Sequence, residues 1–77
     1  MNNNEINKKL EKDKKVTLVS EIKYRGKKYV KTIKSTRNGI EYLYYEIDNN
    51  EIKDIEDEML VSYFKEKYEH KPTNIIY

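Results

Sequence analysis

Cationic and tyrosine side chains are the residues of this sequence whose types and spacing could do chemistry. Lysine and arginine neutralise phosphates, and tyrosine rings stack on unpaired bases at roughly 1–3 kcal/mol each. Exposed tyrosines are also typical anchors of protein–protein interfaces. Seven such residues are predicted to follow the first hairpin and the strand after it, and we treat them as a predicted binding face: Lys23, Arg25, Lys28, Lys34, Arg37, Tyr42 and Tyr44.

Catalytic and metal-binding patterns are not found in the sequence. His70 is the single histidine and there is no cysteine to complete a metal site with it. The acidic turn 48–51 lacks the glycine of a calcium loop, since Ile52 and Lys53 follow it. The serines have neither the flanking glycines of a nucleophile elbow nor a histidine partner. We therefore expect no enzyme, no cofactor, no metal and no small-molecule substrate.

The charges are strongly segregated although the net charge is only +2. Residues 1–39 carry +8 and residues 40–77 carry −6. A surface with two signs can steer a charged protein partner or pair with a second copy of itself. This favours a protein–protein interaction or regulatory factor. The alternative is a protein that binds single-stranded DNA or RNA on a sheet face of lysines and tyrosines.

The composition gives a second reason for the many lysines. Lys, Asn, Ile and Tyr make up 39 of the 77 residues, and there is no Ala. Their codons are rich in A and T, so an AT-rich genome, or a phage or mobile element living in one, explains part of this enrichment. The polar opening and the short apolar runs predict a cytoplasmic protein without a membrane span.

Alternating apolar residues predict a first strand over 16–24, although Val19 breaks its pattern. Arg25-Gly26 supplies a tight turn into a second strand over 28–35. A two-residue loop there would place Ile22 opposite Tyr29 and Leu18 opposite Ile33. One face would then carry Val16, Leu18, Ile22, Tyr24, Tyr29 and Ile33, whereas Val30 and Thr32 would lie on the other.

The second hairpin has two competing registers around Asn38-Gly39. A two-residue Asn38-Gly39 loop would place Tyr42 and Tyr44 on the face of Ile33 and would set Lys31 opposite Glu46. A three-residue loop that begins at Arg37 would place Leu43 and Ile47 there instead. We favour the three-residue loop because it gathers the aliphatic residues. It leaves the two tyrosines on the opposite face with Lys23, Lys28 and Lys34.

A short strand over 52–55 follows the turn at 48–51. Asp54 or Asp57 then caps a helix that runs to about Tyr68. Its predicted apolar stripe consists of Met59, Leu60, Tyr63, Phe64 and Tyr68.

The predicted fold class is α+β, a small antiparallel β-meander of three to four strands covered on one face by a C-terminal helix. Residues 1–15 are expected to form a flexible or weakly helical N-terminal tail, since only Ile6 and Leu10 are helix-spaced apolar residues there. Residues 16–70 are expected to form the single domain, and residues 71–77 are expected to form a C-terminal tail.

Overall fold

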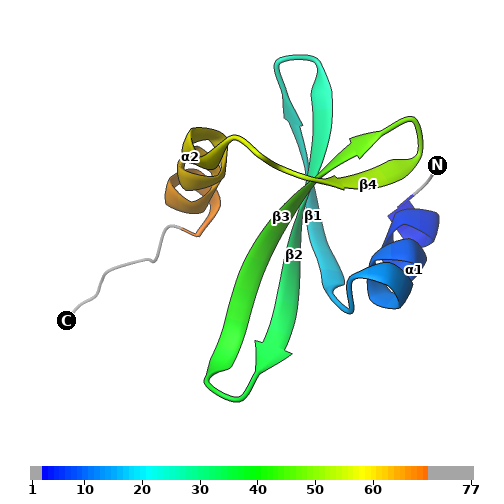
Figure 1. The fold of residues 1–77 in the computed structure, drawn as a ribbon, viewed down its shortest axis with the longest axis vertical. Coiled ribbons are helices and arrows are strands. Elements are labelled where there is room, and N and C mark those ends of the chain that lie inside the picture. The colour runs from blue at the N-terminus through cyan, green and yellow to red at the C-terminus, as the bar shows by residue number, and fades with distance from the viewer. Residues whose placement is uncertain (1–2, 70–77) are drawn as a thin grey trace.

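The computed structural model describes residues 3–69 and has four strands in one antiparallel sheet, in the order β1-β2-β3-β4 (Figure 1). The predicted α+β meander with a C-terminal helix is confirmed. No helix in this range combines the length and the apolar character needed to cross a membrane. The elements are α1 (Asn3–Asp13), β1 (Thr17–Tyr24), β2 (Lys27–Thr36), β3 (Gly39–Asp48), β4 (Glu51–Asp54) and α2 (Glu58–Tyr68).

Both faces of the sheet are covered, one by each helix, whereas the sequence predicted a cover on one face only (Figure 1). Of the two alternatives for the N-terminal segment, the structure has the helix. Ile6 and Leu10 are fully buried against Val16, Val30 and Tyr45. Their spacing of four residues places both on the side of α1 that meets the sheet. This short helix therefore contributes to a hydrophobic core.

Strand β1 supplies residues to both faces because it contains a bulge between Leu18 and Ser20. The predicted pairing of Ile22 with Tyr29 is confirmed, but Leu18 lies opposite Thr32 and not opposite Ile33. Val19, which breaks the predicted alternation of the strand, is the extra residue of this bulge. The extra residue reverses the alternation of side chains. Leu18 therefore packs on the α1 side, while Ile22 packs on the α2 side.

The favoured register of the second hairpin is wrong. The alternative with an Asn38-Gly39 loop has Tyr42 and Tyr44 on the observed face, but its pairing of Lys31 with Glu46 is wrong, because Lys31 lies opposite Tyr44. Thr36 pairs with Gly39 across a two-residue Arg37-Asn38 loop, and Ile33 lies opposite Tyr42. The Thr36 hydroxyl holds the turn, since it accepts from the Asn38 amide at 3.2 Å and donates to the Gly39 carbonyl at 3.1 Å. Gly39 closes the turn with a φ of +124°, which a glycine adopts without strain.

The physical reason for this register is an aromatic core under α2. The Phe64 side chain is fully buried. Its ring centroid lies 5.1–6.0 Å from those of five tyrosines, which is the range of favourable ring pairs. Packing of the tyrosine rings around Phe64 stabilises the fold more than packing of Leu43 and Ile47 on that face would. These tyrosines are Tyr24, Tyr29, Tyr44, Tyr63 and Tyr68.

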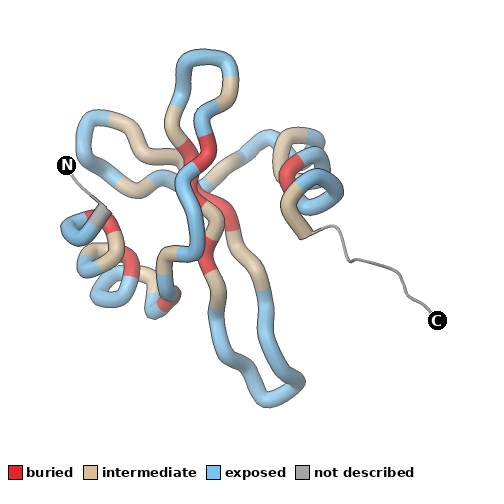
Figure 2. Tube along the Cα trace, turned by 180° about the vertical axis from the view of Figure 1, so that it is seen from behind, coloured by how far each residue is buried: buried red, intermediate tan, exposed pale blue. Residues whose placement is uncertain are grey.

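Helix α2 is capped by Asp57, whose carboxylate accepts from the amides of Met59 and Leu60 at 3.0 and 3.3 Å. Phe64 is the buried residue of this helix, and Figure 2 shows the rest of α2 as intermediate or exposed. The predicted apolar stripe is only partly buried. Met59 is 83% exposed and Tyr63 is 40% exposed.

Candidate protein-binding surface

The structure does not bring the seven residues of the predicted binding face together on one face of the sheet. Side chains alternate between the two faces along β2. Lys28 and Lys34 lie on the same face as Val30, which packs against α1. Lys31 lies on the other face, opposite Tyr44 of β3. Tyr44 and Tyr42 face α2 instead. The predicted grouping of lysines with these tyrosines depended on the wrong register.

Tyr44 is a core residue, with 6% of its surface exposed. Its ring lies 5.7 Å from that of Phe64, and its hydroxyl donates to a Glu69 carboxylate oxygen at 2.8 Å. Burial, and then this hydrogen bond and the charge of Glu69, raise the pKa of the Tyr44 phenol well above its ordinary value. Tyr42 is half-buried beneath the Lys31 ammonium, which lies 4.4 Å from its ring centroid. Neither ring is presented as a flat stacking platform.

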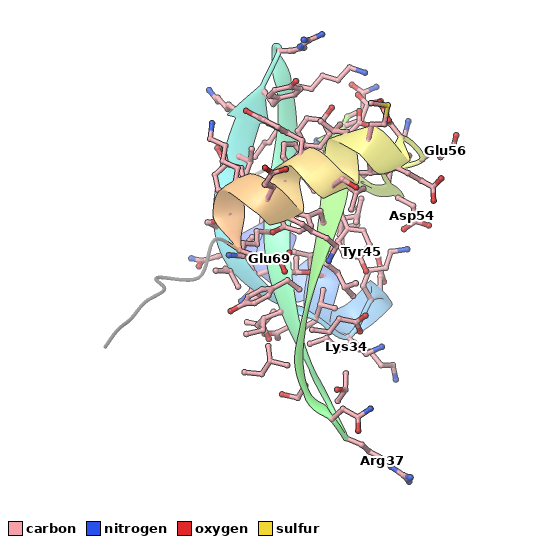
Figure 3. All side chains as sticks on the ribbon, turned by 90° about the vertical axis from the view of Figure 1, so that its left-hand side faces the viewer. Lys34, Arg37, Tyr45, Asp54, Glu56 and Glu69 are labelled. Carbon is pink, nitrogen blue, oxygen red and sulfur yellow. The ribbon has the colours of Figure 1, made fainter. Side chains whose placement is uncertain are left out.

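The predicted cations are dispersed. Lys28 forms an ion pair with Glu21 at 3.0 Å. Lys23 is exposed and lies opposite Lys28 in the register of β1 and β2, near the turn that joins these strands. Figure 3 shows Lys34 and Arg37 on the exposed part of the β2–β3 hairpin, which projects beyond α2. Arg25 lies next to a groove.

This groove, of about 460 Å³, lies between the β1–β2 turn and the first half of α2. Arg25 and Gly26 form the turn with φ values of +51° and +78°, as a two-residue hairpin loop of type I′ requires. The turn places the Arg25 guanidinium 5.4 Å from the ring centroid of Tyr24. Across the groove, the Tyr24 ring centroid lies 5.2 Å from that of Tyr63. The lining is Tyr24, Arg25, Lys27, Tyr29, Asp57, Met59, Leu60 and Tyr63.

A second, shallower hollow of about 320 Å³ lies on the outer side of α2, lined by Glu58, Met59, Ser62, Tyr63 and Glu66. Met59 and Tyr63 line both hollows. They therefore form an apolar ridge between them, which we call the Met59–Tyr63 ridge.

The two sides of the ridge carry opposite charges. Arg25 and Lys27 line the groove, and Glu58 and Glu66 line the outer hollow. Within residues 3–69, none of these four groups takes part in an ion pair.

Two other charges near the ridge already have partners. The Asp57 carboxylate is engaged as the helix cap. The Lys67 ammonium lies 3.4 Å from the Tyr63 hydroxyl, and this hydrogen bond is the main cause that raises the pKa of Lys67. Asp57 and Lys67 keep their charges but are held by hydrogen bonds within the chain. The charged side chains that line the two hollows without a hydrogen bond or an ion pair among residues 3–69 are cationic on one side of the ridge and anionic on the other.

Met59 and Tyr63 were predicted as core residues, and helix geometry explains the difference. At 3.6 residues per turn, Tyr63 points about 100° and Met59 about 140° away from Phe64 around the helix. A helix centred on Phe64 cannot bury both. The sequence did contain a hint of this: the predicted apolar stripe is wider around the helix than the surface that a single sheet face can bury.

Methionine, tyrosine and arginine, which meet at this ridge, are enriched at protein interfaces. Among residues 3–69 there is no cluster of three or more His, Asp or Glu side chains placed to hold a metal ion. Comparison with protein-family models, with curated proteins and with solved structures finds no match for the chain. Its function therefore has to be inferred from its own residues.

Proposed function

We propose that this chain is a small non-catalytic protein-binding module, acting as an interaction or regulatory factor, and that the Met59–Tyr63 ridge and the adjoining groove are its binding surface. The observation that carries the proposal is the exposure of Met59, 83%, next to a Tyr63 that is 40% exposed. An exposed apolar patch rimmed by charges is typical of a protein interaction site.

The ridge is held in place before any partner arrives. The Tyr63 ring packs against Tyr24 at 5.2 Å and against Phe64 at 5.9 Å, and Asp57 fixes the helix turn from which Met59 projects. Side chains that are already ordered lose less conformational entropy on binding. This pre-organisation supports a role for the ridge in binding.

The alternative function, binding of single-stranded DNA or RNA, has less support. It requires lysines and exposed tyrosine rings on one sheet face. Tyr44 is buried under Phe64, and Lys28 and Lys34 face the other way. Titration of labelled oligonucleotides at about 50 and 200 mM salt tests it, since phosphate binding weakens steeply with salt.

The proposal is tested by affinity capture with single-residue variants. Met59→Asp and Tyr63→Asp place a charge on the ridge, whereas Ile40→Asp is a matched control because Ile40 is 64% exposed on the β2–β3 hairpin. We expect a partner protein from the source cells to be captured by the wild type and by the control but not by the ridge variants. Capture that survives both ridge variants would contradict the proposal, as would loss of capture with Ile40→Asp alone.

A further inference from the structure

We propose that the surface that fits the Met59–Tyr63 ridge is the same surface of a second copy of this chain. The inference rests on the proposed function, because it names the partner of the same ridge. The arrangement of unpaired charges carries it: Arg25 and Lys27 on one side, Glu58 and Glu66 on the other.

If a two-fold axis passes through the ridge, the charged groups of the two copies become complementary. In a symmetric dimer, each contact between two different residues occurs twice. A rotation by half a turn places the cationic side of one copy over the anionic side of the other, and the reverse. Arg25 and Lys27 then meet Glu58 and Glu66 of the second copy. A uniformly acidic or uniformly basic partner would satisfy only one of the two sides.

The shape of the surface agrees with this pairing. The ridge stands between a groove of about 460 Å³ and a hollow of about 320 Å³. An identical ridge has depressions beside it to enter, so the Met59 side chains could be covered by tyrosine rings of the other copy. Thioether sulfur makes favourable contacts with aromatic rings.

The expected dimer is weak. The two hollows are lined by a few residues of α2 and of the β1–β2 turn, far fewer than the roughly 20–30 residues per side of a standard interface. We therefore expect a dissociation constant of roughly 10 µM to 1 mM. We also expect it to rise with salt, since exposed ion pairs are screened.

The test is sedimentation equilibrium of the full chain over that concentration range, with charge-reversed variants. Arg25→Glu/Lys27→Glu and Glu58→Lys/Glu66→Lys should each remain monomeric, with a dissociation constant raised at least about tenfold. An equimolar mixture of the two variants should recover the dimer as a heterodimer. Lys34→Glu/Arg37→Glu is the matched control, because it makes the same charge change on the β2–β3 hairpin and should dimerise like the wild type.

Circular dichroism of each variant verifies that it is folded. Glu58→Gln/Glu66→Gln replaces the lysine variant if the helix start does not tolerate two lysines. A wild type that stays monomeric at about 1 mM would overturn the inference, as would a mixture of variants that does not associate. If the wild type is monomeric and ridge-dependent capture of another protein persists, the inference fails while the proposed function stands.

Discussion

Tyr24 of the β1–β2 hairpin and Tyr63 of α2 lie with their ring centroids 5.2 Å apart, at an interplanar angle of 41°. This contact joins a hairpin end to a helix across the groove. It also separates a buried aromatic core around Phe64 from an exposed ridge that includes Met59. The same helix therefore stabilises the fold with one side and carries the proposed binding surface on another.

The register of the second hairpin is tested by truncating its two tyrosines separately. Tyr44→Ala should lower the free energy of unfolding by about 3–5 kcal/mol, because it leaves a cavity beside Phe64. Tyr42→Ala should cost roughly 1–2 kcal/mol, because Tyr42 is only half-buried. Urea unfolding followed by circular dichroism measures both. Equal, small losses would show that Tyr44 is not a core residue.

The raised pKa of Tyr44 predicts how stability depends on alkaline pH. Its phenol has a higher pKa in the folded protein than the ordinary 10.0 of the unfolded chain. The stabilisation of the neutral phenol is therefore complete below pH 10.0 and is lost as the pH rises towards the folded pKa. Burial raises the pKa of Tyr29 and Tyr45 in the same direction.

Tyr44→Phe removes this contribution, so the variant should lose less free energy of unfolding than the wild type between about pH 10 and 12. The measurement is urea unfolding at several pH values in that range. Glu69→Gln is an informative companion, because it keeps an acceptor for the Tyr44 hydroxyl but removes the nearby charge. Identical slopes for the wild type and Tyr44→Phe would contradict the burial of the phenol.

The helix cap links fold stability to binding. Asp57→Ala should cost about 1 kcal/mol, within a range of roughly 0.5–2 kcal/mol, because two amides of the first turn lose their acceptor. Asp57→Asn is the control, since asparagine caps about as well as aspartate. The alanine variant should also weaken partner binding, because Met59 projects from the frayed turn. Thermal unfolding that does not distinguish the two variants would argue against this cap.

Helix α1 is predicted to be an integral part of the fold. Ile6→Ala should lower the free energy of unfolding by about 2–5 kcal/mol, because the side chain is fully buried. Lys8→Ala on the exposed side of the same helix should change it by less than about 0.5 kcal/mol. Chemical denaturation measures the difference. A variant at Ile6 as stable as the wild type would show that α1 does not pack on the sheet.

Local sequence patterns predicted the elements of this fold but not the faces of its sheet. The tight turn at Arg25-Gly26, the cap at Asp57 and the strand alternation are determined by neighbouring residues, so they could be predicted. The faces depend on a single residue at each of two places: the bulge at Val19 and the loop at Arg37-Asn38. Adding one residue at either place reverses every later side chain.

The prediction of the candidate site also depended on the register of the second hairpin. Arg25 was predicted as a binding residue and lines the groove, because its position in the turn depends on local geometry alone. Tyr42 and Tyr44 moved to the other face with the register. Met59 and Tyr63 were missed because an apolar stripe does not show how it is rotated about the helix axis until its centre, Phe64, is known.

The most direct test of the central claim is site-specific photo-crosslinking in the source cells. A benzophenone amino acid replaces Tyr63 in one variant and Ile40, a more exposed position outside the ridge, in another. We predict a covalent adduct from position 63, to a partner protein or to a second copy of the chain, and none from position 40. An adduct from position 40 alone, or equal adducts from both positions, would contradict the assignment of the Met59–Tyr63 ridge as the binding surface.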